Sequence, residues 1–281
     1  MKIKANAKIN LALDVTGKRD DGYHSVSMLM QEVSLCDNIE IIPNDSGIVD
    51  MKLINSNLPC DDKNIAVRAA KLFFETTGIN GGCTIILEKN IPVCAGLGGG
   101  SSDAAAVLKG LNELYGFPLS KDKLLSLALS LGADVPFFII GAAARAEGIG
   151  EVLTPVSSKL GGWVCIIKPD IDISTPLAYK AIDSLTYPHP DINKVIDAAI
   201  KGNREEFINN AANVFEYVCC PLHPEIDHLK KHLYENGAFF AMMSGSGPSV
   251  FGLFETKADA EHAFNLYKGS FQGGGVCSLV E

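Results

Sequence analysis

The stretch PVCAGLGGGSSDAAAV, residues 92–107, holds groups that could bind an anion. Four of its glycines fall between Gly96 and Gly100, and Ser101 and Ser102 follow directly. Consecutive glycines let backbone N–H groups converge, and a helix that starts there adds free N–H groups and the positive end of its dipole. The serine hydroxyls could bind phosphate or Mg²⁺. A flexible spacer is the alternative, but spacers do not normally join a strand to an Ala/Leu-rich helix, so the pattern favours phosphate binding.

Three standard glycine-rich nucleotide motifs do not fit this loop. The Walker A motif needs a lysine after its last glycine, and no lysine occurs between Lys89 and Lys109. The dinucleotide motif GxGxxG fails because Ser101 or Asp103 occupies the third glycine position, depending on where the count starts. A protein-kinase glycine loop lies in a hairpin, whereas this loop runs from a predicted strand into a predicted helix. The pattern alone therefore indicates an anion site without naming its type.

Two further places in the chain carry polar groups in unusual settings. Lys8 lies in the alternating run AKINLAL, where a lysine is ordinarily solvated, and Asn10 projects from the same face of that strand. Asp134 stands between a predicted helix end at Gly132 and an apolar run that begins at Pro136. A helix N-cap is the structural explanation for such an aspartate.

Two histidines of the second half have a spacing that metal ligands can have. His228 and His232 are four residues apart on a predicted helix, which is a metal-ligand spacing. The HExxH order is absent, and Lys230 and Lys231 lie between the two histidines. A solvated helix face is therefore favoured over a metal site.

Hydrophobic periodicity predicts the elements that position these groups. Residues 1–54 alternate as β-strands, with a break at residues 36–38, and residues 62–78 show helical spacing that ends at Gly78. A strand at 83–93 leads into the glycine loop, and the helix behind the loop has a serine available as its N-cap.

The second half of the chain begins with a strand at residues 163–168. Beyond it the patterns predict helices at 192–203, 205–218, 225–237 and 258–269, with strands around 238–245 and 249–255. The segment 156–162 is predicted as the domain boundary, which divides the chain into residues 1–155 and 156–281.

Composition limits the class of protein. The chain has 281 residues, 47% hydrophobic and 20% charged, which allows one large or two medium domains. The absence of a long apolar window and of a secretory signal predicts a soluble protein without membrane association. Eight dispersed cysteines without a CxxC pair predict reduced thiols and a cytoplasmic location. A net charge of −9 argues against nucleic-acid binding. The oligomeric state, monomer or homodimer, stays open.

The glycine loop resembles the glycine-serine loop of the GHMP kinase superfamily. Three further stretches fit that superfamily in order: residues 7–41, LGADVPFF at 131–138 and MSGSGPSVFGLF at 243–254. The resemblance spans nearly the whole chain. It implies an α+β, two-domain GHMP kinase fold with the active site in the interdomain cleft. Residues 1–155 would form the ATP-binding domain and residues 156–281 the substrate domain.

The same resemblance implies the activity, which is ATP-dependent phosphorylation of a hydroxyl with ATP and Mg²⁺ as cofactors. The run AKINL, then GYH, then MQxVxLxDxIxI resembles family members that act on the methylerythritol part of a cytidine diphosphate conjugate, in the non-mevalonate isoprenoid route. A sibling kinase for mevalonate, phosphomevalonate or homoserine is disfavoured by GYH. A non-catalytic nucleotide-binding sensor is disfavoured by the retention of Lys8 and Asp134.

The resemblance also implies roles for single residues. Lys8 and Asp134 would be catalytic, with Asp134 either orienting or deprotonating the acceptor hydroxyl. Asn10, Tyr23, His24 and Tyr179 would bind substrate. Ser101 would be the Mg²⁺ ligand, and the turn at 244–249 would lie near the substrate phosphates. The ATP-binding residues would be Asn64, Pro92, Val93, Cys94, Ala95, Gly96, Leu97, Gly98, Gly99, Gly100, Ser101 and Ser102. For Asn64 the structural alternative is a role at a helix N-terminus.

Overall fold

The computed structural model describes residues 1–281 and contains both helices and strands, so the expected α+β class is confirmed. The chain forms two compact units. Unit 1 comprises residues 1–7, 36–93 and 98–141, and unit 2 comprises residues 8–35, 94–97 and 142–281. The first two strands, β1 (Lys2–Lys18) and β2 (His24–Asn44), and the glycine loop supply residues to both units. The division at residue 155/156 stays a prediction.

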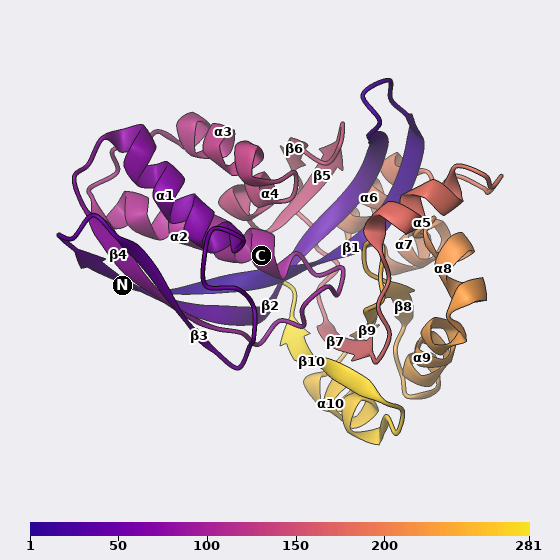
Figure 1. Cartoon of the computed structure of the whole chain (residues 1–281). Coiled ribbons are helices and arrows are strands. Elements are labelled where there is room, and N and C mark those ends of the chain that lie inside the picture. The colour runs from indigo at the N-terminus through magenta and orange to yellow at the C-terminus, as the bar shows by residue number, and fades with distance from the viewer. The chain divides into compact units, whose positions relative to one another are not determined.

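Unit 1 combines a sheet with four helices, which lie on one face of that sheet in Figure 1. The strand β4 (Gly82–Glu88) pairs antiparallel with the end of β2 and parallel with β3 (Val49–Ile54). Cys83, Ile85 and Leu87 alternate along β4 and are buried, as period-two patterning requires. The helices are α1 (Ile65–Thr77), α2 (Gly99–Leu114), α3 (Lys121–Leu131) and α4 (Val135–Ile140).

The helix α1 ends at Gly78 as the sequence predicts, but it begins at Ile65 rather than at residue 62. The Asn64 side chain accepts a hydrogen bond from the Ala66 N–H, which satisfies one of the free donors of the first turn. Gly78 adopts φ 67° and donates to the Phe74 carbonyl at the other end. Asn64 therefore does have the helix N-terminal role considered from sequence.

The helix α2 begins differently from the prediction. Gly98, with φ 69°, occupies the N-cap position, and no side chain caps the helix. The prediction of a serine N-cap is wrong because the left-handed glycine lets the helix start at Gly99. Ser101 and Ser102 consequently lie inside the first turn.

The strand β2 also differs from the prediction, because it runs without interruption through residues 36–38. Asp-Asn pairs ordinarily favour turns over strands. Here Asp37 is completely buried, and its carboxylate accepts hydrogen bonds from two backbone N–H groups at Asn90 and Ile91. Contacts with residues more than 50 positions away thus override the local turn signal.

Unit 2 contains two groups of strands. The first part of β2 pairs antiparallel with β5 (Ala143–Glu147), which pairs with β6 (Val152–Pro155). A separate antiparallel sheet has the order β10 (Phe271–Ser278), β7 (Trp163–Pro169), β9 (Val250–Phe254), β8 (Phe240–Met243). The helices are α5 (Thr175–Ile182), α6 (Ile192–Lys201), α7 (Arg204–Asn210), α8 (Glu216–Leu222), α9 (Pro224–Glu235) and α10 (Lys257–Leu266). Of these, α9 and α10 contact the separate sheet, as Figure 1 shows for α10 beside β10.

The single helix predicted over residues 205–218 is wrong, because α7 and α8 are separated at residues 211–215. Asn213 forms an isolated bridge with Leu13. Its side-chain amide also donates to the carbonyl oxygens of Met243 and Gly245, each at 2.8 Å. These contacts hold Asn213 outside a helix and fix the turn that follows β8.

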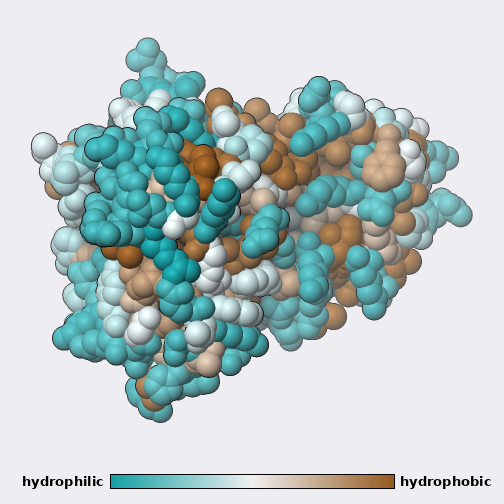
Figure 2. Space-filling model, turned by 180° about the vertical axis from the view of Figure 1, so that it is seen from behind, coloured by the Kyte–Doolittle hydropathy of each residue, from teal (hydrophilic) through white to brown (hydrophobic).

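The face in Figure 2 is covered mostly by hydrophilic residues, with hydrophobic residues in separate patches. Exposed apolar side chains such as Phe117 and Leu222 occur singly along the chain, which is normal for a protein surface. None of the helices combines the length and the apolar character that crossing a bilayer would require.

Candidate active site

Lys8 and Asn10 lie side by side on β1 and are both buried, with 5% and 1% of their surfaces exposed. The Lys8 ammonium donates to Asn10 Oδ1 at 2.6 Å, and Asn10 Nδ2 donates to the sulfur of Met28. The ordinary expectation of a solvated strand lysine is therefore wrong for Lys8. A buried ammonium is expensive without polar partners, so this position is built around its charge.

The middle of the glycine loop, residues 94–97, is joined to the same strand. The Lys8 N–H donates to the Leu97 carbonyl at 2.9 Å, and the Ser244 hydroxyl donates to the Gly96 carbonyl at 3.0 Å. The Asn10 N–H in turn donates to the Ser244 hydroxyl at 3.3 Å. Gly96 has φ 74°, and a Cβ there would overlap the Ser244 carbonyl oxygen, so only glycine fits. Three sequence motifs thus meet in one hydrogen-bonded group.

The segment Ser244–Ser249 forms the predicted turn between β8 and β9. The Ser244 N–H donates to the Ser249 carbonyl at 2.8 Å, and the Gly247 N–H donates to the Ser244 carbonyl at 3.0 Å. Sequence reasoning missed the part that Asn213 has in holding this turn. Its position inside a helical pattern gave no signal of that contact.

The end of the glycine loop has the features that an anion requires. Within the first turn of α2, the Ser102 N–H bonds to the Gly98 carbonyl, while the helix has no side-chain cap. The first N–H groups of a helix have no partner within the helix, and α2 is long enough to carry a dipole. Ser101 is half-buried and Ser102 is buried beside them. These groups fit a nucleotide phosphate.

A buried ion cluster in unit 1, made of Asp37, Lys89 and Asp103, connects both ends of the glycine loop. The Lys89 ammonium donates to Asp37 Oδ2 and, at 2.8 Å, to Asp103 Oδ2 in the early part of α2. Asp37 Oδ1 accepts from the N–H groups of Asn90 at 2.6 Å and Ile91 at 2.8 Å, just before the loop. The cluster therefore holds the segment that enters the loop and the helix that leaves it.

The cluster has one cation for two carboxylates. Burial, together with the negative charge of Asp37, raises the pKa of Asp103 to about 8 even though Lys89 opposes the shift. Burial would lower the pKa of Lys89, but the two carboxylates raise it. Asp103 Oδ1 has no hydrogen-bond partner. No local sequence pattern indicates this cluster, because its members belong to separate elements far apart in the chain.

Asp134, in unit 1, immediately precedes α4 and is half-buried. Its carboxylate makes no capping hydrogen bond to that helix. The structural explanation considered from sequence, an N-cap, is therefore not realised by the side chain. A carboxylate that does not cap its helix remains available for chemistry.

One predicted substrate-binding residue of unit 2, His24, belongs to a second network, which we call the Asp183 network: Lys18, His24 and Asp183. His24 Nε2 lies 2.6 Å from Asp183 Oδ1, and Lys18 Nζ lies 2.6 Å from Asp183 Oδ2. The His24 ring stacks on Tyr179 at a centroid distance of 4.7 Å, whereas Tyr23 is 61% exposed. All three members of the network line a cavity of about 360 Å³. Sequence reasoning found His24 and Tyr179 but missed Asp183.

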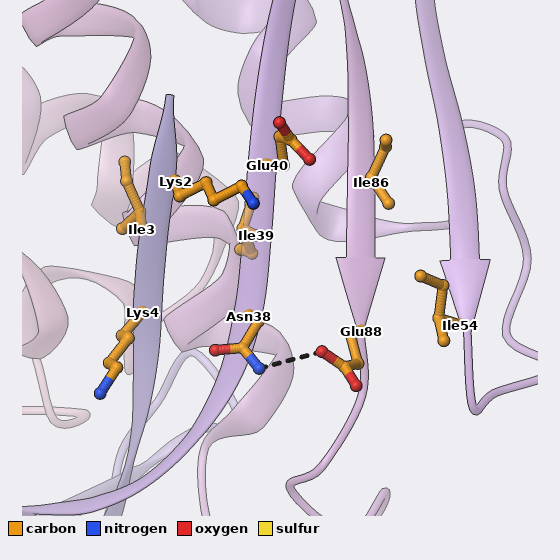
Figure 3. A pocket seen from close by; sticks show the side chains of 9 residues that line it. All are labelled: Lys2, Ile3, Lys4, Asn38, Ile39, Glu40, Ile54, Ile86 and Glu88. Carbon is orange, nitrogen blue, oxygen red and sulfur yellow. Dashed lines mark hydrogen bonds between the residues drawn. The ribbon is translucent and has the colours of Figure 1, made fainter.

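A second hollow, of about 500 Å³, lies on the sheet of unit 1 and is shown in Figure 3. Lys2 and Lys4 extend from β1, and Asn38 on β2 donates to Glu88 on β4 at 3.0 Å. Ile54 and Ile86 contribute apolar surface. None of the predicted site residues lines this hollow, so it is separate from the candidate active site.

Residues that could hold a metal ion are sparse. No group of three His, Cys, Asp or Glu side chains is placed to bind one, and all eight cysteines are free. His232 Nε2 lies 2.8 Å from the Ala263 carbonyl and is engaged there. A Mg²⁺ ion would therefore depend on ATP phosphates and on hydroxyls such as that of Ser101.

Comparison with known proteins identifies the family. The family model of the GHMP kinase N-terminal domain matches residues 64–142, and that of the GHMP kinase C-terminal domain matches residues 190–267. The chain belongs to the GHMP kinase family. It is accordingly an ATP-dependent small-molecule kinase.

Relatives within this family are similar over nearly their whole lengths. The 4-diphosphocytidyl-2-C-methyl-D-erythritol kinase of Clostridium acetobutylicum is 43% identical, with 94% of each chain covered. That of Lachnoclostridium phytofermentans is 45% identical, with 95% of this chain and 92% of the relative covered.

Solved structures agree at the level of the fold. The crystal structure of a 4-(cytidine 5'-diphospho)-2C-methyl-D-erythritol kinase covers both chains fully, with 35% identity and a TM-score of 0.85. Homoserine kinase from Cytophaga hutchinsonii, at 20% identity and a TM-score of 0.77, shares the fold; 100% of this chain and 94% of that chain are covered.

Proposed function

We propose that this GHMP kinase transfers the terminal phosphoryl group of ATP to a hydroxyl of 4-diphosphocytidyl-2-C-methyl-D-erythritol, in the non-mevalonate isoprenoid precursor pathway. The observation that carries the proposal is the hydrogen-bonded group formed by Lys8, the glycine loop and Ser244. It joins the strand that carries the buried Lys8 ammonium to the glycine loop, which supports a phosphate site there. The names of the full-length relatives support the choice of acceptor.

The glycine loop binds the phosphates of ATP in this proposal. The N–H groups at the start of α2 and the Ser101 and Ser102 hydroxyls supply fixed dipoles, so no loop lysine is needed. Ser101 adds an oxygen ligand for Mg²⁺, which neutralises phosphate charge when bound. Asn64, fixed at the start of α1, lies near the adenine.

Lys8 offsets the negative charge of the transferring phosphoryl group. Its ammonium is buried and held by Asn10, so little reorganisation is required when that charge develops. Asn10 contacts the substrate from the same face of β1.

Asp134 orients the acceptor hydroxyl and accepts its proton late in the transfer. A carboxylate is a weak base towards an alcohol. The loose transition state of phosphoryl transfer requires little help from a base at an early stage. Orientation is therefore the larger part of its contribution.

The cytidine end of the substrate binds at His24, with Tyr23 and Tyr179 as aromatic neighbours. The exposed Tyr23 ring can cover one face of a base, and stacking of a base on an aromatic ring contributes about 1–3 kcal/mol. Tyr179 already stacks on His24, so it supports the ring that contacts the base.

The test is an ATP-consumption assay with the diphosphocytidyl substrate beside mevalonate and homoserine. We expect turnover with the diphosphocytidyl substrate and background rates with the other two. Comparable or faster turnover of mevalonate or homoserine would overturn the choice of acceptor. ATP binding without turnover of any of the three would instead indicate a nucleotide sensor.

A further inference from the structure

The Asp183 network holds the His24 ring by its edge and by its face. At the edge, His24 Nε2 lies 2.6 Å from Asp183 Oδ1. At the face, the ring stacks on Tyr179, which itself meets Phe215 edge-on at 4.8 Å. The side chain of His24 is only 9% exposed, so the ring has little freedom to turn.

The carboxylate of Asp183 is ionised at neutral pH. Hydrogen bonds from Lys18 and His24 hold the pKa of Asp183 below its ordinary value. An ionised carboxylate can only accept hydrogen bonds. His24 Nε2 must therefore carry the proton in this contact, and in the neutral ring Nδ1 is left as an acceptor.

We propose that Asp183 is a specificity-determining positioning residue, which fixes the His24 tautomer so that the site selects an amino-bearing pyrimidine over an oxo-bearing one. This inference rests on the proposed function only in that His24 reads the base. Asp183 itself is the C-cap residue of α5 and acts through His24.

The selection follows from hydrogen-bond chemistry. Cytosine presents an amino donor where uracil presents a carbonyl acceptor. A fixed acceptor at His24 Nδ1 pairs with the amino group of cytosine. The carbonyl of uracil would instead face the lone pair of that nitrogen, and no hydrogen bond would form. Sites built to bond a particular polar group reject analogues that cannot supply it, because the buried partner is then unpaired.

Lys18 completes the arrangement from the other side of the carboxylate. It lies at the end of β1 and donates to Asp183 Oδ2 at 2.6 Å, so each carboxylate oxygen has one donor. Three elements, β1, β2 and α5, therefore converge on the group that orients His24.

The experiment compares binding of CDP and UDP by calorimetry to the full chain and to D183N. Asparagine keeps the shape but can accept from or donate to His24, so both tautomers become available. We expect the wild type to prefer CDP by at least about tenfold, and D183N to lose roughly that factor. Nitrogen-15 spectra of the histidine rings should show His24 protonated at Nε2 in the wild type and mixed in the variant.

The matched control is D197N, which removes an exposed carboxylate from α6 in the same unit. It should change neither the CDP preference nor the His24 spectrum. Thermal unfolding of both variants checks that each is folded. An unfolded D183N is replaced by D183S, for which the same loss of preference is expected.

The outcomes separate this inference from the proposed function. A wild type that prefers CDP, with an unchanged preference or an unchanged His24 spectrum in D183N, overturns the role of Asp183 while the kinase assignment stands. A wild type without preference between CDP and UDP also overturns the inference. Failure of the kinase assignment would appear as absent turnover of the diphosphocytidyl substrate, whatever the binding preference.

Discussion

The buried ion cluster of unit 1 places one lysine between two carboxylates, whereas the Asp183 network of unit 2 places one carboxylate between a lysine and a histidine. The first is almost entirely removed from solvent, with side chains 5% exposed or less. In the second, the Lys18 and Asp183 side chains are 59% and 26% exposed. Burial makes each charge costly to leave unpaired, while exposure screens it. Similar contacts should therefore stabilise the fold in unit 1 and orient a binding group in unit 2.

The largest effect on stability is expected from D37A. It removes the acceptor of two backbone N–H groups and one partner of the buried Lys89 ammonium. Breaking a buried ion pair by removing one partner destabilises by about 3–5 kcal/mol. Urea unfolding measures this loss, and a loss below about 1 kcal/mol would contradict the importance of burial.

The next effect is a dependence of stability on pH. The pKa of Asp103 is about 8 in the fold and ordinary, near 3.8, when unfolded. The folded state thus binds the proton of Asp103 more tightly than the unfolded state does. The stabilisation of the fold by this proton is therefore full below about pH 4 and is lost as pH rises towards 8. The slope from one proton reaches about 1.4 kcal/mol per pH unit. Unfolding of the wild type and D103N from pH 5 to 8 measures it; parallel curves would contradict the assignment.

A smaller and different effect is expected from H24A. Loss of the imidazole that hydrogen-bonds the base should raise the Michaelis constant for the cytidine substrate by about tenfold, with little change in turnover. Steady-state kinetics at saturating ATP measure both constants. An unchanged Michaelis constant would make the base-reading role of His24 wrong.

The smallest effect is expected from K18A. The Lys18 side chain is mostly exposed, so its pair with Asp183 should contribute less than about 1 kcal/mol to stability. Urea unfolding of K18A and D37A under the same conditions compares the two losses of stability. A loss as large as that of D37A would show that exposure does not separate the two networks.

The parts of the fold that the sequence predicted depend on local signals. The helix α1 carries its own cap at Asn64 and its own stop at Gly78, and both are in the structure. The glycine loop does lie between a strand and a helix, as its flanking patterns indicated. Such features depend on neighbours a few residues away, which a single sequence displays.

The parts that the sequence missed depend on distant contacts. Asp37 reads as a strand break, but hydrogen bonds to Asn90 and Ile91 keep it within β2. Asn213 fits a helical pattern, but the carbonyls that it binds after β8 hold it outside. No sequence pattern around Asp183 indicates its contact with His24. In each case the deciding partner is more than 25 residues away, so periodicity could not reveal it.

The measurement that tests the central claim most directly is the activity of D134N. With the diphosphocytidyl substrate and ATP, we predict a fall in turnover of roughly 10²–10⁴ while the dissociation constant for ATP stays nearly the same. That result would separate the group that handles the hydroxyl from the loop that binds ATP. Near-normal turnover in D134N would contradict the account.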